Sequence, residues 1–226
     1  MRVAAILSML HEPAEVNSAT RAFFDQPVLT WTLRRLSLST HLQPSIIVCW
    51  ADQAESVRAA GAEPSIVGPR LDMPSLNAIA IARKWSDGWR GGLLGSCEFD
   101  LGFDGRVFAS IAEKRGLEAI VLINPAAAGI DPELVDRTIE HTTEHSAIEY
   151  AFVPAAPGFG LMLLRASLLA RLADANASPG QLISYRPDAP IREPLGSESC
   201  VEAPLPIVRS TRRFTLDCQH QVDVLS

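Results

Sequence analysis

The sequence predicts an α/β fold, a three-layer α/β/α sandwich built on a mostly parallel, Rossmann-like central sheet. Short apolar runs alternate with amphipathic stretches, which is typical of strands joined by helical crossovers. The run 119–123, Ala-Ile-Val-Leu-Ile, is apolar on both faces, as expected of a strand buried in a parallel sheet. Asp131-Pro132-Glu133 predicts a helix start, because it combines a capping carboxylate, a proline in the first turn and a second acid near the positive end of the helix dipole.

The other elements follow from the same patterns. Apolar and β-branched runs predict further strands at 4–10, 45–50, 65–67, 150–153, 161–164 and 213–216. Apolar residues at helical spacing, with Pro27 in a first turn and Gly61 after a last turn, predict helices at 27–39, 51–60, 73–85, 105–115 and 166–175. The glycine-rich stretch 88–95 predicts a loop at the rim of a site, and the proline-rich stretch 178–206 predicts an irregular excursion. The length suits one domain over 1–226.

Composition excludes several classes of protein. The net charge of −6 is spread along the chain and the longest basic segment is the short one from Arg209 to Arg213, so binding to nucleic acid is not expected. The apolar N-terminus is interrupted by His11-Glu12-Pro13, which predicts a strand rather than a signal peptide, and no apolar run approaches the roughly 20 residues of a membrane helix. The four cysteines form no C-x-x-C pair and no Cys/His cluster with metal spacing, which fits reduced thiols in a cytoplasmic protein.

Three stretches resemble the cytidylyltransferase family that includes CMP-sugar synthetases and spore-coat polysaccharide biosynthesis proteins. Residues 27–36 (Pro-Val-Leu-Thr-Trp-Thr-Leu-Arg-Arg-Leu) are similar to the family's first helix, 130–136 (Ile-Asp-Pro-Glu-Leu-Val-Asp) to the helix after the metal-binding strand, and 213–217 (Arg-Phe-Thr-Leu-Asp) to the final strand with its aspartate. Their order and spacing agree over nearly the whole chain. The resemblance implies the nucleotide-diphospho-sugar transferase fold, which is GT-A-like, and homodimerisation, which is common in the family.

The loop after the first predicted strand departs from the family pattern. The family has a glycine-rich, basic loop there, because a triphosphate needs close backbone approach and positive charge. Here the loop reads Met-Leu-His-Glu-Pro-Ala-Glu-Val-Asn-Ser, so the expected arginines fall at Met9 and Ala14, the lysine at Ser18 and a glycine at His11. His11, Asn17 and Ser18 are the candidates left for contacting a nucleotide, and the alternative for His11 is an ordinary polar surface residue.

The metal site that the resemblance implies is also altered. The family holds Mg²⁺ between an aspartate after the central strand and one after the last strand, since hard oxygen ligands suit that ion. Asp217 matches the second aspartate, whereas Ala126 stands at the first. Two acidic positions that would face the sugar correspond to Gly160 and Met162, which predicts an apolar wall there. Asp217 is thus the candidate Mg²⁺ ligand, at a strand end where open parallel sheets place ligands.

Three acids near the middle of the chain are the candidates for a catalytic role. Glu98, Asp100 and Asp104 alternate in an extended loop, where carboxylates can converge to bind a metal ion or act as general bases. The alternative is a solvated loop in which Asp104 caps the following helix.

Three hypotheses follow. Coordinated loss of the basic loop, the first metal aspartate and the sugar-facing acids favours a catalytically degenerate protein, a pseudoenzyme that binds a nucleotide or nucleotide-sugar, or docks on a protein partner. The alternative is an active Mg²⁺-dependent sugar nucleotidyltransferase, which makes CMP-sugar and pyrophosphate from CTP and a sugar for cell-surface polysaccharide biosynthesis. A third hypothesis makes the chain one domain of a larger protein.

Overall fold

A six-stranded sheet forms the centre of the structure, a computed structural model that describes residues 1–72, 74–83, 88–89, 97–184, 190 and 193–226. Its strands are β1 (Val3–Ser8), β4 (Leu42–Cys49), β5 (Pro64–Ile66), β6 (Ala119–Ile123), β7 (Tyr150–Val153) and β8 (Leu161–Arg165). They follow the order β5-β4-β1-β6-β8-β7. The strands β5, β4, β1 and β6 are parallel, β8 runs antiparallel to β6, and β7 runs antiparallel to β8. The predicted mostly parallel sheet is confirmed.

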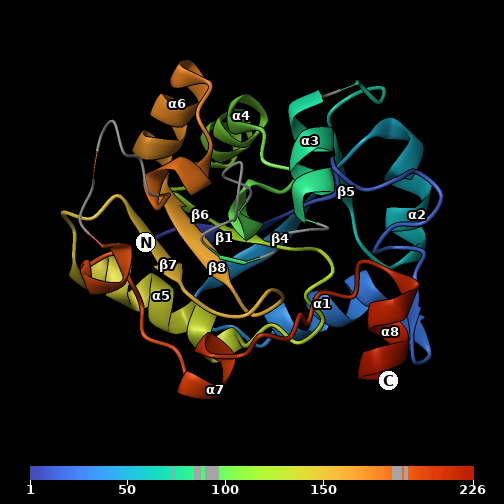
Figure 1. Cartoon of the computed structure of the whole chain (residues 1–226). Helices are drawn as coiled ribbons and strands as arrows, with labels where there is room; N and C mark the ends of the chain where they lie inside the picture. Colours follow the sequence, from blue (N-terminus) through green and yellow to red (C-terminus); the bar gives the residue numbers. More distant parts are fainter. Residues whose placement is uncertain (73, 84–87, 90–96, 185–189, 191–192) are drawn as a thin grey trace.

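Helices cover both faces of the sheet (Figure 1). Successive residues of β1 point to opposite faces, so Val3, Ala5 and Leu7 belong to one buried cluster and Ala4 and Ile6 to another. The first cluster includes residues of α1 (Val28–Leu36), α2 (Ala54–Ala59) and α5 (Pro132–Glu144), and the second includes residues of α4 (Gly105–Arg115) and α6 (Ala166–Ala175). This is the expected three-layer α/β/α sandwich.

Shorter elements surround the sandwich. They are the hairpin strands β2 (Ala22–Phe23) and β3 (Gln26–Pro27), the helices α3 (Pro74–Arg83), α7 (Leu205–Val208) and α8 (Gln219–Leu225), and the 3₁₀ helices η1 (Ala51–Gln53), η3 (Glu98–Asp100), η4 (Pro179–Leu182) and η5 (Pro194–Gly196). Within the described ranges, none of the helices has the length and apolar character needed to cross a bilayer.

Most predicted elements are found near their predicted bounds. The helices α4 and α6 and the strands β6 and β7 have the predicted limits, and Asp131 caps α5 by accepting the Glu133 N–H (3.1 Å). The described part of the excursion 178–206 contains only η4, η5 and the start of α7. The predicted helix 73–85 corresponds to α3 where it is described, and the loop 88–95 lies outside the described residues apart from Gly88 and Trp89.

The prediction of a last strand at 213–216 is wrong. In the structure this segment forms no strand, and its N–H groups donate to two different places: Phe214 to the carbonyl of Pro157 (2.8 Å) and Leu216 to the carbonyl of Ala126 (2.9 Å). Ala126 follows β6 and Pro157 follows β7, at the same edge of the sheet, so the segment crosses this edge instead of pairing along one strand. A strand pattern in the sequence does not reveal this direction, because extended backbone serves both arrangements.

The crossing requires a glycine beneath it, and this can be tested. Gly158 has φ +96°, and a β-carbon there would lie 2.6 Å from the carbonyl carbon of Phe214. We expect Gly158→Ala to lower the free energy of unfolding by roughly 2–4 kcal/mol in urea titrations, because it combines backbone strain with overpacking. Gly196→Ala is the control, since a β-carbon there meets no atom within 4 Å. Equal effects of the two substitutions would contradict this account.

Candidate functional site

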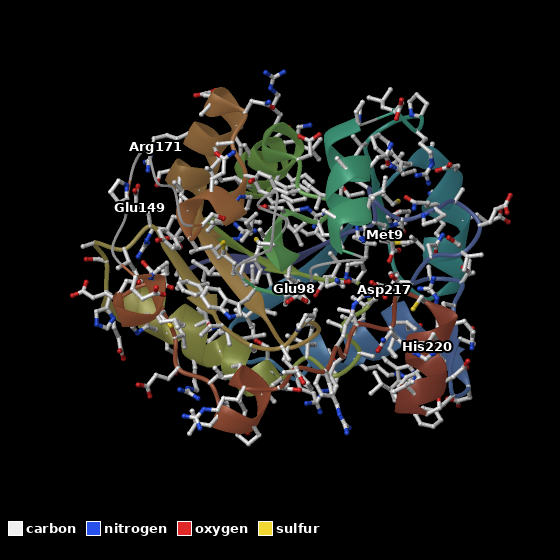
Figure 2. All side chains as sticks on the ribbon, in the orientation of Figure 1. Met9, Glu98, Glu149, Arg171, Asp217 and His220 are labelled. Carbon is white, nitrogen blue, oxygen red and sulfur yellow. The ribbon has the colours of Figure 1, made fainter. Side chains whose placement is uncertain are left out.

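The carboxyl ends of β1, β6 and β7 lie at one edge of the sheet, and most of the predicted site residues belong to segments that meet there. Open α/β sheets bind their ligands in the crevice outside such strand ends. In Figure 2, Met9, Glu98 and Asp217 are labelled in the central part of the molecule, away from the exposed pair Glu149 and Arg171. We refer to this edge as the crevice.

The segment after β1 is folded onto itself through Glu12. This buried carboxyl accepts hydrogen bonds from the Ser18 N–H (3.0 Å) and from the Ser18 hydroxyl. Burial raises the pKa of Glu12, and the hydrogen bonds from Ser18 and the charge of Arg21 oppose that rise. Asn17 is also fully buried, and its amide donates to the carbonyl of Ala14 (2.8 Å). The candidates Asn17 and Ser18 therefore lie inside the loop, where they hold its shape.

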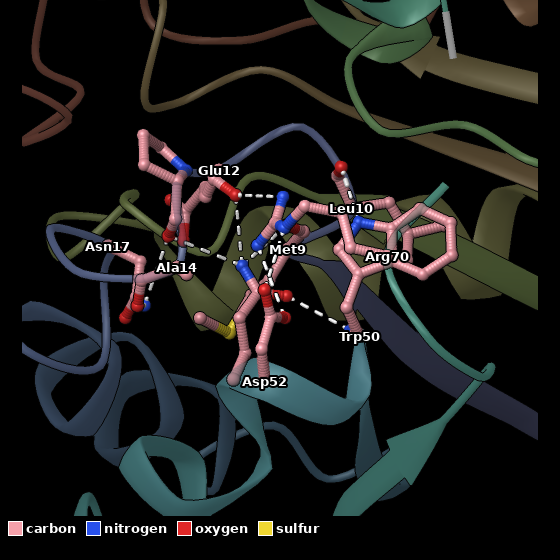
Figure 3. A network of polar contacts seen from close by, with 10 residues as sticks. Met9, Leu10, Glu12, Ala14, Asn17, Trp50, Asp52 and Arg70 are labelled. Atoms are coloured by element: carbon pink, nitrogen blue, oxygen red, sulfur yellow. Dashed lines mark hydrogen bonds and ion pairs between the residues drawn. The ribbon is translucent and has the colours of Figure 1, made fainter. Parts of the chain in front are cut away.

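Side chains from the segment that follows β4 hold the same loop (Figure 3). The Trp50 indole donates to the carbonyl of Leu10 (2.9 Å), and the Gln53 amide donates to the carbonyls of Met9 (3.1 Å) and Glu12 (3.0 Å). The N–H groups of Met9 and Glu12 themselves donate to carbonyls of the protein. A phosphate loop presents such N–H groups to its ligand, so this loop is built differently.

Arg70 belongs to the candidate site, although the sequence did not identify it as a site residue. It follows β5, donates to the carbonyl of Glu12 (3.0 Å) and is held by Asp52 (2.8 Å). It places a positive charge beside a loop that has no Lys or Arg of its own between Met9 and Ser18. The sequence signal is only an arginine shortly after the predicted strand 65–67, which carries little information without the fold.

Arg70 and His11 line a cavity of about 440 Å³ together with Glu12, Asp72 and Asn77. This volume falls within the range of roughly 300–1,000 Å³ that is usual for small-molecule pockets. The side chains that line it include both a positively charged group, Arg70, and acidic groups, Glu12 and Asp72. The structure thus brings His11 to a pocket of ligand size, where it is partly exposed.

Glu98 provides a carboxylate in the wall that the sequence predicts to be apolar. It is almost completely buried, accepts the Gly158 N–H (2.8 Å) and stands so close to Gly160 that a β-carbon on Gly160 would lie 2.7 Å from Glu98 Oε2. Met162 is buried in the core, as expected for an apolar position. The apolar prediction is therefore wrong at Gly160, because the space of the missing side chain is taken by Glu98.

A small cavity of about 20 Å³ joins Glu98 to the ends of β1 and β6. Its polar lining consists of Ser8, His11, Glu98 and Asn124. Asn124 accepts the Ala126 N–H (2.9 Å), while its buried Nδ2 has no hydrogen-bond partner among the described residues. The cavity has room for about one water molecule, which such a buried donor favours.

Asp100 and Asp104 do not converge with Glu98. Asp100 is buried and accepts the Gly180 N–H (2.6 Å), which ties η3 to η4. Asp104 caps α4 by accepting the Val107 N–H (3.0 Å), as the alternative prediction proposed. The idea of a solvated loop is wrong for Glu98 and Asp100, because both carboxyls are enclosed by the protein.

Asp217 lies beside Ala126, as the resemblance implied. The Leu216 N–H bonds to the Ala126 carbonyl (2.9 Å), which brings the next residue to the end of β6. The carboxylate of Asp217 forms an ion pair with Arg213, whose Nε also donates to Thr215 Oγ1 (2.7 Å). Ala126 itself is fully buried and packs in an apolar cluster with Val28, Leu216 and Val222.

The whole chain is similar in shape to solved cytidylyltransferases. A cytidylyltransferase from Leptospira borgpetersenii serovar Hardjo-bovis superimposes with a TM-score of 0.63 at 16% identity, covering 100% of this chain and 85% of that one. The Rv0371c protein of Mycobacterium tuberculosis H37Rv, in complex with manganese, superimposes with a TM-score of 0.58 at 16% sequence identity. The match covers 100% of this chain and 97% of that one. CMP:2-keto-3-deoxy-manno-octonic acid synthetase in complex with CTP superimposes with a TM-score of 0.54 at 8% sequence identity. The match covers 80% of this chain and 81% of that one. The chain has the cytidylyltransferase fold.

No family model and no curated protein matches the sequence. At such low identities the similarity of shape establishes the fold, and the function has to be argued from the site. The nucleotide-diphospho-sugar transferase fold implied by the sequence resemblance is confirmed.

The residues at the metal position of the cytidylyltransferase fold do not fit Mg²⁺. This ion requires a near-octahedral set of oxygen ligands, whereas Ala126 offers no side-chain oxygen and the Asp217 carboxylate faces the Arg213 guanidinium. In the part of the chain that the structure describes, no three His, Cys, Asp or Glu side chains come together as a metal site.

Asp100 makes the stability of the fold depend on pH. Burial raises the pKa of Asp100 from 3.8 to about 6, although hydrogen bonds from Gly180, Ser178 and Cys97 oppose the shift. The folded state holds this proton more tightly than the unfolded state, so the free energy of unfolding falls as pH rises from about 4 to about 6, by roughly 3 kcal/mol. We expect Asp100→Asn, which can still accept from Gly180, to become increasingly stable relative to the parent across that window.

Urea titrations at several pH values measure this difference. Asp104→Asn is the matched control, because it removes a carboxylate from the same segment and asparagine also caps helices well. A pH-independent difference between Asp100→Asn and the parent would contradict the assignment.

Proposed function

We propose that this chain is a catalytically degenerate protein of the cytidylyltransferase fold that binds a small polar ligand, a nucleotide or nucleotide-sugar, without Mg²⁺-dependent nucleotidyl transfer. The observation that carries the proposal is the Arg213–Asp217 ion pair next to the buried Ala126. An arginine that faces the remaining carboxylate neutralises its charge and donates a hydrogen bond to one of its two oxygens, Oδ2. The position then has no need of a divalent cation.

The segment after β1 supports the same proposal. Glu12 and Ser18 are bonded to each other, and neither Lys nor Arg occurs between Met9 and Ser18. Each charge-assisted contact to phosphate that is lost weakens binding by roughly 1.5–3 kcal/mol. Losing several of them leaves little affinity for a triphosphate, while the pocket of about 440 Å³ beside Arg70 still accommodates a smaller polar molecule.

The rival function is Mg²⁺-dependent transfer of CMP from CTP to a sugar. Two buried atoms favour it, because Asp217 Oδ1 and Asn124 Nδ2 have no hydrogen-bond partner among the described residues. Both are polar groups that a ligand in the crevice could satisfy. Homodimerisation, a docked protein partner and a cytoplasmic location stay predictions from the sequence.

Calorimetric titration of CTP and the other nucleoside triphosphates, with and without Mg²⁺, tests the proposal. We expect any binding to be weak and unchanged by the metal, and we expect no pyrophosphate release in the presence of sugars, because the donor set does not hold Mg²⁺. Micromolar CTP binding that needs Mg²⁺, or metal-dependent release of pyrophosphate, would establish the rival function instead.

Replacement of Asp217 separates an ion-pair role from a metal-ligand role. We expect Asp217→Asn to lower the free energy of unfolding by about 1 kcal/mol, since it breaks a partly exposed ion pair, and to leave nucleotide binding unchanged. Asp223→Asn is the control, because Asp223 lies exposed on α8 and accepts from Gln219 (2.8 Å). Loss of metal-dependent binding at unchanged stability would refute the ion-pair role.

A further inference from the structure

A second pocket lies beside the turn between β7 and β8. It has a volume of about 230 Å³ and is lined by the turn residues 155–157, by residues of the segment 208–213, and by Gly88 and Trp89. None of the residues that line the larger cavity beside Arg70 contributes to it. We refer to it as the arginine pocket, because Arg212 and Arg213 form part of its wall.

The arginine pocket is held open by the fold. The Ala156 N–H donates to the carbonyl of Ile207 (2.9 Å), and the Phe214 N–H donates to the carbonyl of Pro157 (2.8 Å). The segment between these two bonds is therefore fixed to the turn at both ends. The hollow between them belongs to the folded structure and does not depend on a loose chain end.

Arg213 is oriented by its neighbours. Its Nε donates to Thr215 Oγ1 (2.7 Å), and its guanidinium forms the ion pair with Asp217. Two separate contacts fix the plane of the guanidinium at the wall of the pocket. A side chain ordered in this way loses less conformational entropy when a ligand binds.

The chemistry of the wall favours an anion. Besides the two arginines, Ser210 and Thr211 contribute hydroxyl groups, and the described lining contains no acidic side chain. This lining is notable in a chain whose net charge is −6. Asp217 offsets part of the charge of Arg213, so the exposed Arg212 supplies the net positive charge of the pocket.

We propose that the arginine pocket binds the phosphate group of a small phosphorylated molecule. A planar guanidinium pairs with two phosphate oxygens at once, and hydroxyl groups donate to the remaining oxygens. Trp89 stacks on Phe152 with a ring-centroid distance of 5.3 Å and offers an apolar wall for the organic part of the ligand. The volume lies below the range usual for drug-sized ligands, which suits a monophosphate better than a nucleoside triphosphate.

The rival explanation is a basic surface strip that attracts acidic proteins. Arg209, Arg212 and Arg213 are close in sequence, and exposed arginines are often simply solvated. The concave shape, the hydroxyl groups and the tryptophan favour a small ligand, because a flat docking surface needs none of them. The proposal goes beyond the binding function assigned to the crevice, and its test uses neither CTP nor a metal ion.

The test is a titration of the full chain with inorganic phosphate, with glucose 6-phosphate and with glucose, followed by tryptophan fluorescence. We expect saturable binding of both phosphates with dissociation constants of about 1 mM or below, no binding of glucose, and weaker binding at high salt. Trp89→Phe should abolish the fluorescence change. Tighter binding of glucose 6-phosphate than of inorganic phosphate would identify an organic phosphate as the ligand class, and equal binding would identify the free ion.

Three substitutions locate the binding. Arg212→Gln should weaken phosphate binding about tenfold or more, because it removes a charge-assisted contact, and Thr211→Glu should do the same by placing a carboxylate at the rim. Both positions are exposed, so folding is expected to persist and is checked by thermal unfolding. Arg209→Gln is the matched control, since Arg209 is an exposed arginine of the same segment that does not line the pocket, and it should change binding less than about twofold.

Two results would overturn the proposal. One is the absence of saturable binding of either phosphate to the folded wild-type chain. The other is equal weakening by Arg209→Gln and Arg212→Gln, which would indicate the diffuse basic strip and its attraction for acidic proteins.

Discussion

The crossing of the carboxyl edge by residues 214–216 is the interaction on which the rest of the structure depends. Two backbone hydrogen bonds, Phe214 to Pro157 and Leu216 to Ala126, join the end of the chain to the turns after β7 and β6. Arg21 adds a bond to the carbonyl of Leu216 (3.0 Å). This crossing positions Asp217 at the crevice and fixes the C-terminal end of the segment 208–213 that lines the arginine pocket, so both proposed binding features share a single support.

Around this crossing, the differences from the metal-binding pattern that the resemblance implied are consistent with one another. Ala126 packs against Leu216 in an apolar cluster, where a carboxylate would be costly to bury. Without a cation beside it, Asp217 would be a partly buried charge lacking a counter-ion, and Arg213 provides one. The loss of one carboxylate and the pairing of the other therefore have the same electrostatic explanation. The glycine at 158 allows the chain to pass this closely.

The crevice also contains charged side chains that do not stand at the sequence positions where the family resemblance places charges. Glu98 comes from η3 and fills the space beside Gly160, on the wall where the resemblance places an acidic side chain. Arg70 comes from the segment after β5 and bonds to the loop after β1. In both cases a charge expected at one position is supplied by a distant part of the chain, and contacts between segments 58 or more residues apart become visible only when the chain is folded.

The sequence by itself determined the sandwich, its central buried strands and the caps at Asp104 and Asp131, because these depend on local periodicity and capping chemistry. Only the tertiary structure decided that 213–216 crosses the sheet edge, that Asn17 and Ser18 face inward, that Asp100 binds Gly180 and that Asp217 pairs with Arg213. The physical reason is that a polar side chain chooses its partner by distance in space, and for most of these groups that distance is set by how the elements pack rather than by sequence spacing.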